Sequence, residues 1–316
     1  MSYNNQIIFN AITIHFSCTI FVSENSLHLS DICILVAIVT HLNFSKSPST
    51  PWFKLLFTRR NKLRNNQTIP RIEGLWEKVS VHDLQSYNEL TLFQGEHLPI
   101  TYPQVLATPI HMQILAHKQF PLPSFGLVHL SQEMEYHQPI MLGDTFDILS
   151  WVENHESVRK GVQFDLHTQI QKEGAIVWTA KSTVFSRSVQ GHNKKTARKK
   201  EPKIDKDSPT IWTIPENLGR RYTKISGDFN PIHLYSWTAK PFGFPRHIIH
   251  GMWTMARSLS SFSTPIKKVE CHFIRPVFLP STAHFYSQRT GNKGSFILSN
   301  PTNEKTHIWG DVELDT

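Results

Sequence analysis

The sequence predicts an α+β protein built from two similar blocks in tandem, each a helix followed by a long antiparallel sheet. Three observations support this prediction. The 316 residues include 39% apolar residues, enough for about two domains with cores of their own. Apolar and polar residues alternate along several segments on each side of a basic stretch. One segment with helical spacing of apolar residues precedes each set of alternating segments.

The first 50 residues differ from the rest of the chain in composition. Residues 1–45 contain no Lys, Arg, Gly or Pro, so they lack the positive segment with which a secretory signal begins. Their longest apolar run, Ile32–Val39, is far shorter than the ~20 residues that span a bilayer. We interpret residues 1–50 as an atypical extension, either poorly ordered or translated from a misplaced start codon. We predict neither export nor a membrane span.

Residues 70–190 form the first predicted domain. Its helix, over 103–120, carries Ile110 and Ile114 on one side. Three segments with period-two alternation follow, and Lys172–Gly174 supplies the turn between the last two. The predicted strands are 145–153, 162–171 and 175–188.

A basic stretch separates the two blocks. Between Lys194 and Lys206, seven Lys or Arg residues stand against Glu201 and Asp205, which gives a net charge of +5. The charge of +8 on the whole chain is therefore concentrated in a short polar run instead of being spread over a folded face. We interpret residues 191–207 as a solvated basic linker and predict no nucleic-acid binding.

Residues 208–316 form the second predicted domain and repeat the pattern of the first. The helix over 250–262 has Met255 among the apolar residues on one side. The segments around Pro139 and Pro276 each join an apolar strand to a proline and a turn, which suggests an internal duplication. The predicted strands are 283–290, 295–300 and 307–314.

The hexapeptide Asp-Phe-Asn-Pro-Ile-His contains the residues best suited to chemistry. Pro231 fits the first position of a helix, where its missing N–H has no partner to lose, and Asn230 is a favoured N-cap. His233 is then predicted in the first helical turn, with Asp228 on the preceding loop after the flexible Gly227. A carboxylate and an imidazole would thus meet one water. The alternative is an Asx turn with a structural histidine.

These residues resemble the R-specific enoyl-CoA hydratase signature of the MaoC-like dehydratase family. The resemblance rests on Tyr222, on the run Ser226–His233, on Gly243–Met252 and on Phe273–Pro280. It is close over residues 215–285 and fades to pattern-level similarity in the first block, which has no counterpart of Gly-Asp-x-Asn-Pro-Ile-His.

The resemblance implies a tandem (double) hot-dog fold, in which each half is a long helix wrapped by an antiparallel sheet. Such a chain is an intrachain pseudo-dimer, with residues 70–190 as a degenerate half and 208–316 as the catalytic half. The degenerate half would support the acyl-binding tunnel. A homodimer of these chains is left open.

The activity implied by the resemblance is that of a hydro-lyase. Water adds reversibly to a trans-2-enoyl thioester of coenzyme A or acyl carrier protein and gives the (R)-3-hydroxyacyl thioester. Water loses a proton as its oxygen attacks C3, and C2 gains one, so an acid/base pair on one face is sufficient. By resemblance, Asp228 and His233 hold the water and handle both protons, while Asn230 orients the loop or His233. No cofactor is implied.

The start of the helix after His250 suits the negative charge that develops on the thioester oxygen. Its first N–H groups have no acceptor within the helix, and the positive end of the helix dipole lies there. We predict the N–H of Gly251 as the principal oxyanion donor, because a missing side chain leaves room for the thioester. His250 is predicted as a second contributor.

Other functions remain as alternatives. The eighteen histidines include His247 and His250 at HxxH spacing, but no HExxH motif or nearby Cys specifies a ligand set, so we predict no metal site. A noncatalytic acyl-thioester-binding protein and a hot-dog thioesterase are the remaining functional alternatives. Cys18, Cys33 and Cys271 lack disulfide or metal spacing and favour a reducing compartment, so we predict a cytoplasmic protein.

Overall fold

The structure is a computed structural model that places most of the two predicted domains. It describes residues 39–44, 71–76, 81–95, 97–117, 119–123, 126–158, 161–187, 199–302 and 304–315, the first two ranges by their backbone only. Most of the predicted extension 1–50, Cys18 and Cys33, and residues 191–198 of the predicted linker lie outside the described residues.

The strands form one continuous sheet that runs through both halves of the chain. Its order is β1-β2-β4-β5-β6-β3-β8-β11-β10-β9-β7, and every neighbouring pair is antiparallel except β1 and β2. The strands are β1 (Val39–Phe44), β2 (Arg71–Trp76), β3 (Leu127–Tyr136), β4 (Phe146–Val158), β5 (Gly161–Lys172), β6 (Ala175–Arg187), β7 (Thr210–Ile214), β8 (Ile266–Phe273), β9 (Ser281–Thr290), β10 (Lys293–Ser299) and β11 (Thr306–Leu314).

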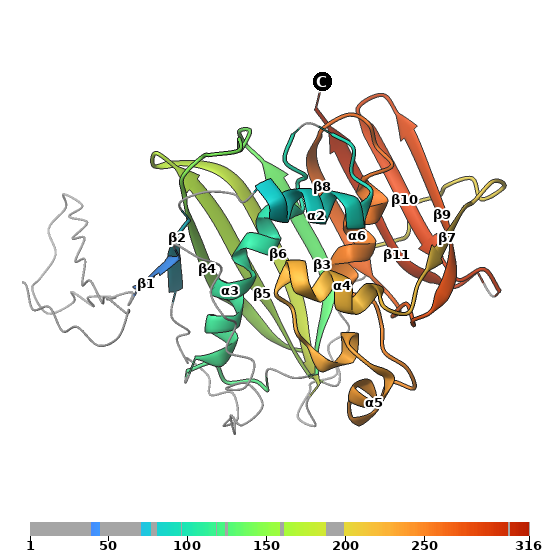
Figure 1. Ribbon diagram of the computed structural model, residues 1–316, viewed down its shortest axis with the longest axis horizontal. Coiled ribbons are helices and arrows are strands. Elements are labelled where there is room, and N and C mark those ends of the chain that lie inside the picture. Colours follow the sequence, from blue (N-terminus) through green and yellow to red (C-terminus); the bar gives the residue numbers. More distant parts are fainter. Residues whose placement is uncertain are drawn as a thin grey trace, which may run out of the picture.

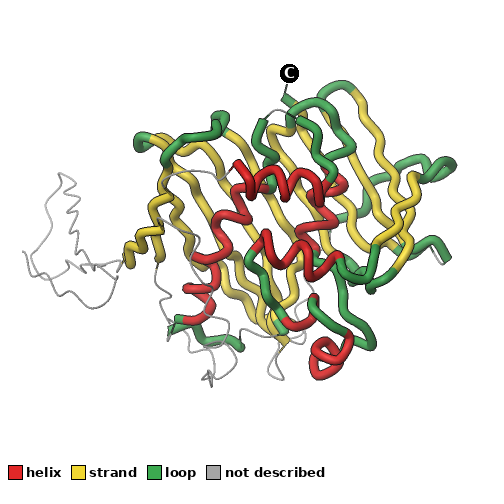
Figure 2. Tube along the Cα trace, in the orientation of Figure 1, coloured by secondary structure: helices red, strands yellow, loops and turns green. Residues whose placement is uncertain are grey.

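The helices gather on one face of this sheet and leave the other face without helices among the described residues (Figures 1 and 2). They are α2 (Val81–Thr91), α3 (Tyr102–Ala116), α4 (Leu218–Ser226), α5 (Ser236–Ala239) and α6 (Gly251–Leu259), with the 3₁₀ turns η1 (Pro231–His233) and η2 (Lys240–Phe242). The predicted α+β class, with helices covering antiparallel sheet, is confirmed.

In the first half, α3 packs against the meander β4-β5-β6. Ala107, Ile110 and Ile114 of α3 are fully buried, as the helical spacing of these residues predicts. The turn between β5 and β6 holds Glu173 at φ 52° and Gly174 at φ 81°, the left-handed conformations that match a two-residue hairpin to the twist of its strands. The boundaries of β5 and β6 agree with the predicted strands to within one residue, whereas β4 runs five residues beyond its predicted end, to Val158.

In the second half, α6 packs against the sheet β8-β11-β10-β9. Met255 and Leu259 of α6 are buried together with Val269 of β8 and Phe296 of β10. The core of this half is continuous with the core of the first, because buried residues of both form a single hydrophobic cluster. Burial of this apolar surface is the main force that holds α6 to the sheet.

The two halves join through the pairing of β3 with β8. The register runs from Ser131 opposite His272 to Glu135 opposite Lys268. Lys268 also donates a 2.8 Å hydrogen bond to Glu135 across this seam. On the helical side, the indole Nε1 of Trp253 donates to the backbone oxygen of Leu90 at 2.9 Å. The two halves are therefore connected by strand pairing, by a shared hydrophobic core and by a hydrogen bond between helices.

The described part of the predicted linker lies against the second half. Lys199 pairs with Glu270 of β8, and Ile204 packs on the cluster of Tyr286, Ile297 and Trp309. Ile297 points to the sheet face opposite the main core, since its neighbours Phe296 and Leu298 belong to that core. Residues 199–207 thus cross the helix-free face of the sheet.

Two local expectations are wrong. The Asn-Pro-Ile-His segment does not begin an α-helix: it forms the single 3₁₀ turn η1, and the next helix, α5, starts only at Ser236. The hydroxyl of Thr238 accepts the N–H of Tyr235 at 3.1 Å and so caps α5 as a separate element. Each half also holds a helix that was not predicted, α2 in the first and α4 in the second. None of the described helices has the length and apolar character that a membrane span requires.

Candidate active site

Helix α4 immediately precedes the predicted catalytic loop. Gly227 ends this helix at φ 69°, and its N–H donates to the carbonyl oxygen of Thr223 at 2.9 Å. A left-handed residue at this position reverses the chain, and glycine adopts that conformation without the steric cost of a Cβ. The turn places Asp228 beside the helix end instead of continuing the helix outward.

The loop after Gly227 is fixed by its own polar side chains. Oδ1 of Asp228 accepts the N–H of Asn230 at 3.1 Å, and Oδ1 of Asn230 accepts the N–H of Ile232 at 3.4 Å. Asn230 is the N-cap of η1, and Pro231 follows it. These bonds leave Oδ2 of Asp228 directed toward the imidazoles described below, and the Asp228 side chain is 34% exposed.

His233 is buried and held in one tautomer. Its Nδ1 lies 2.9 Å from the backbone oxygen of Ile248, and because a carbonyl only accepts, Nδ1 carries the hydrogen. Burial lowers the pKa of His233, while the charge of Asp228 opposes that shift. The ring is therefore neutral near pH 7, with its lone pair on Nε2, and that atom lies 3.9 Å from Oδ2 of Asp228.

The Nε2 of His250, the N-cap residue of α6, lies 3.9 Å from the same Oδ2 of Asp228. This nitrogen donates to the backbone oxygen of Asp228 at 3.1 Å, and the ring of His250 stacks on His233 with centroids 3.7 Å apart. Burial and the neighbouring His233 lower the pKa of His250 well below its usual value. Its ring also lies 5.0 Å from that of Tyr222 on α4. His250 thus ties the start of α6 to the aspartate loop.

The gap between Asp228 and His233 suits one water. The two atoms are 3.9 Å apart, too far for a direct hydrogen bond, but a single water oxygen can lie about 2.8 Å from both. Such a water would donate one hydrogen to the carboxylate and the other to the Nε2 lone pair. The structure therefore brings together the two groups that the sequence singled out, with the geometry of a shared solvent molecule.

Gly251 is the first residue of α6 and is closely packed against β8. A Cβ at this position would come within 3.0 Å of the ring of Phe273 on β8. The ring of Phe273 in turn packs on His129 of β3, with centroids 4.6 Å apart. The close packing of Phe273 therefore explains why residue 251 has no side chain. The use of Gly251 to admit a thioester stays a prediction.

The first half contributes to the site through residues that the sequence did not indicate. His129 reaches the neighbourhood of Gly251 through Phe273, and Tyr87 of α2 lies 6.2 Å, ring to ring, from Tyr222. These contacts join segments that are distant in the chain, so neither spacing nor composition could reveal them.

Asp228, His233 and His250 also form the one cluster of potential metal ligands among the described residues, with donor atoms within 4.8 Å of one another. The hydrogen bond from Nε2 of His250 to the Asp228 carbonyl uses the hydrogen on that nitrogen, so in this arrangement Nε2 of His250 offers no lone pair to an ion. His247 faces elsewhere, since its nitrogens contact Ser236 and the carbonyl oxygen of Glu216.

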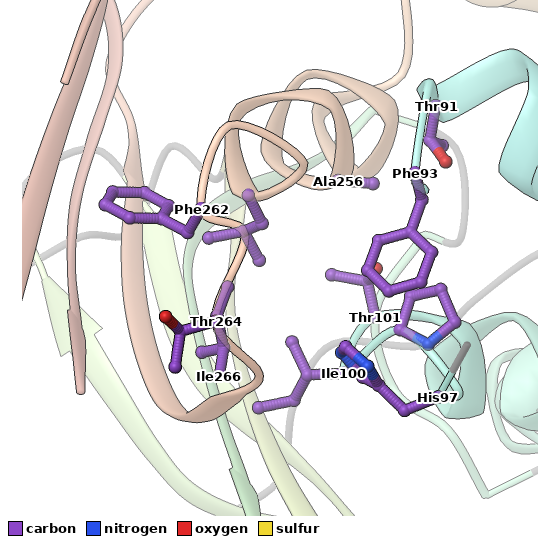
Figure 3. Close-up of a pocket in the computed structure, with 11 residues that line it drawn as sticks. Thr91, Phe93, His97, Ile100, Thr101, Ala256, Phe262, Thr264 and Ile266 are labelled. Atoms are coloured by element: carbon purple, nitrogen blue, oxygen red, sulfur yellow. The ribbon is translucent and has the colours of Figure 1, made fainter. Parts of the chain in front are cut away.

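A separate pocket opens at the other end of α6 (Figure 3). It lies between the loop 91–101 of the first half and the residues from Ala256 to Ile266 of the second. Its described lining residues have apolar side chains or are threonines, apart from His97, which is titratable. Asp228, His233 and His250 are not among its lining residues, so this pocket is separate from the candidate site at the start of α6.

Each half of the chain matches a known protein family. Residues 192–309 match the family described as MaoC like domain, which contains the loop and α6. Residues 86–177 match the family described as FAS1-like, dehydratase domain region. The first half is therefore related to dehydratases even though it lacks the aspartate loop.

Individual proteins are similar to this chain over about three quarters of its length, across both halves. The chain is similar to 3-hydroxyacyl-thioester dehydratase X of Mycobacterium tuberculosis, with 30% identity over 259 residues, covering 77% of this chain and 92% of that protein. Enoyl-CoA hydratase ChsH3 of the same organism is 22% identical over 275 residues, covering 78% and 95%. The crystal structure of HtdX from Mycobacterium tuberculosis superposes with a TM-score of 0.67 at 25% identity, covering 77% of this chain and all of that one. The chain therefore belongs to the MaoC-like dehydratase family and has its double hot-dog fold.

Proposed function

We propose that the protein is a hydro-lyase that adds water reversibly to a trans-2-enoyl thioester and forms the (R)-3-hydroxyacyl thioester. Its relatives carry the names of a 3-hydroxyacyl-thioester dehydratase and an enoyl-CoA hydratase, which are the two directions of one reaction. The observation that carries the proposal is the 3.9 Å separation of Asp228 Oδ2 and His233 Nε2. The hydrogen bond from Nδ1 of His233 to Ile248 O leaves the lone pair on Nε2, where it could accept a proton from water.

In this proposal, Asp228 and the neutral His233 hold the attacking water. As the water oxygen bonds to C3, one O–H bond breaks and the proton passes to the acid/base pair. The electrons of the C2=C3 bond move toward the thioester, and C2 then takes a proton from the same pair. Because both transfers come from one side of the acyl chain, addition is syn. Dehydration follows the same steps in reverse.

The enolate oxygen needs a donor opposite this pair. Gly251 and Met252 lie in the first turn of α6, and the first backbone donors that bond within the helix are Trp253 and Thr254, both to His250 O. We assign the oxyanion contact to the Gly251 N–H, where the helix dipole adds to the attraction. His250 holds the Asp228 carbonyl in this assignment, so its role is to position the loop. Asn230 has the same role through its cap of η1.

Asp228→Asn and His233→Ala test the assignment. Each is expected to lower the turnover number for crotonyl-CoA by roughly 10²- to 10⁴-fold, as loss of a general acid or base does. The loss of absorbance of the conjugated enoyl thioester reports the rate, and circular dichroism reports whether each variant is folded. Asp205→Asn, which changes an exposed carboxylate of the linker, is the matched control and should keep the wild-type rate.

Two results would contradict the proposal. Near-normal turnover in both variants would remove Asp228 and His233 from the chemistry. Binding of enoyl-CoA by wild-type protein without turnover at any chain length would favour a noncatalytic acyl-thioester-binding protein, and release of free CoA would favour a thioesterase.

We further propose a cytoplasmic protein that works as an intrachain pseudo-dimer. Cys271 is a buried free thiol, which is compatible with a reducing compartment. The domain limits 70–190, 191–207 and 208–316 are part of this proposal, and assembly into a homodimer stays a prediction. Size-exclusion chromatography with light scattering would measure the assembly state directly.

A further inference from the structure

Two aromatic rings stand exposed immediately after the catalytic turn. The side chains of Tyr235 and Trp237 are 44% and 72% exposed, although large apolar rings normally avoid water. Their planes are nearly parallel, 16° apart, with centroids 6.0 Å apart. We define these two residues as the aromatic platform. Figure 1 shows its helix, α5, at the edge of the helical layer, beyond α4.

The platform is anchored to the catalytic elements. The guanidinium of Arg220 lies 4.6 Å from the ring centre of Tyr235, and its NH1 group donates to the carbonyl oxygen of Leu234 at 2.9 Å. Thr238 donates to the carbonyl oxygen of Pro231 in η1 at 2.6 Å. These contacts hold Tyr235 and the short helix α5 in place before any ligand binds, which reduces the conformational entropy lost on binding.

The platform also lies within a limited distance of the acid/base pair. Trp237 follows His233 by four residues, so their Cα atoms are separated by at most ~14 Å. The extended pantetheine arm of coenzyme A is longer than this distance. A nucleotide resting on Trp237 would thus allow the thioester at the other end of the arm to reach Asp228 and Gly251.

The chain segment that carries the platform is basic, and one of its cations, Arg220, contacts the platform directly. Residues 218–246 contain five basic side chains and one acidic side chain, Asp228, a net charge of +4. No described acidic residue other than Asp228 occurs in this segment, and Asp228 faces the two histidines. The basic residues are Arg220, Arg221, Lys224, Lys240 and Arg246. A ligand that combines a flat ring with several phosphates matches this surface better than an apolar ligand does.

We propose that the aromatic platform stacks the adenine of coenzyme A and that Arg220 and other basic side chains of the segment 218–246 hold its phosphates. This inference rests on the proposed function and narrows the substrate class to CoA thioesters. An acyl carrier protein presents the same pantetheine arm and an acidic surface, but it has no purine to occupy Trp237. The exposed rings, and not the charge alone, therefore favour the nucleotide.

Trp237→Ala, assayed with two thioesters of the same acyl group, tests the proposal. Crotonyl-CoA carries the nucleotide, whereas crotonyl-pantetheine has the arm without it. Loss of base stacking is expected to lower kcat/KM for crotonyl-CoA by about 5- to 100-fold, mainly through KM, and to leave crotonyl-pantetheine within twofold of wild type. Trp237→Phe keeps a flat ring and should recover most of the loss. Adenosine 3′,5′-bisphosphate should inhibit wild type competitively and Trp237→Ala more weakly.

Ile211→Ala is the matched control, because Ile211 is another large apolar side chain, 64% exposed, on the edge strand β7. It should leave both kcat/KM values unchanged. An equal effect of Trp237→Ala on both thioesters, or no effect on either, would overturn the nucleotide site. Wild-type protein that turns over neither thioester would instead refute the proposed function, so the two failures are distinguishable.

Discussion

At the scale of single residues, a backbone carbonyl decides how His233 can act. The Ile248 oxygen accepts from Nδ1 at 2.9 Å and thereby leaves the lone pair on Nε2, facing Asp228. The stacked His250 uses its own Nε2 hydrogen on the Asp228 backbone oxygen. Because the hydrogen-bond partners of the two adjacent imidazoles differ, we propose different roles for them, proton transfer for His233 and positioning of the loop for His250.

Gly251→Ala should show what the absence of a side chain is needed for. The new Cβ would lie 3.0 Å from the Phe273 ring, so overpacking is expected to lower the free energy of unfolding by about 1–3 kcal/mol. In a Phe273→Leu background the clash is removed, and the same change should cost almost nothing. Urea unfolding of the four proteins completes this double-mutant cycle. Equal losses in both backgrounds would show that Phe273 is not the reason for the glycine.

The sequence alone could predict that some of these residues lie close together, but not others. Asp228, Asn230 and His233 lie in one hexapeptide, so local turn chemistry brings them together and motif spacing could predict it. The stacking of His233 on His250 depends on how α6 returns to the loop. The contact of His129 with Phe273 depends on the pairing of β3 with β8, which no local pattern specifies.

At the scale of elements, alternation and helical spacing located α3, α6 and most strands, because one face of each is buried in a single core. Helices α2 and α4 were not predicted because most of their residues are polar. In α4, only Leu218, Tyr222 and a few small or polar residues are buried. Their helical form is stabilised by contact with neighbouring elements more than by their own apolar stripe.

The linker offers a test at this scale. Ile204 packs on Tyr286, Ile297 and Trp309, so Ile204→Asp should lower the free energy of unfolding by about 1–3 kcal/mol, through lost apolar burial and a desolvated charge. The neighbouring Lys203 is exposed, and Lys203→Asp should change stability by less than about 0.5 kcal/mol. Urea denaturation measures both. Equal stability of the two variants would mean that the linker contact contributes nothing.

At the scale of the whole molecule, buried neutral histidines should make stability sensitive to acid. Burial lowers the pKa of His111 to about 3 and that of His129 to about 4, from an ordinary value of 6.5. Below pH 6.5 the unfolded chain takes up protons that these folded side chains do not, so stability falls as pH drops toward their folded pKa values. At pH 5 each histidine should reduce the free energy of unfolding by about 2 kcal/mol.

Urea titrations at pH 7.5 and pH 5 measure this decrease. His111→Gln is the informative variant, because an amide can still contact the hydroxyl of Thr168, which lies 2.7 Å from His111 Nε2, but cannot titrate. The difference in stability between the two pH values should shrink by about 2 kcal/mol in this variant. An unchanged difference would show that His111 takes up its proton without unfolding.

The seam between β3 and β8 has a consequence for how the two halves can diverge. In an assembly of identical single units, every substitution appears on both sides of the symmetry axis at once. Here the two sides are separate stretches of one polypeptide, tied by a linker that keeps them together even at extreme dilution. The first half could therefore lose the aspartate loop and still keep His129 and Tyr87, which support the candidate site. The result is a chain in which only one of the two halves carries the proposed catalytic loop.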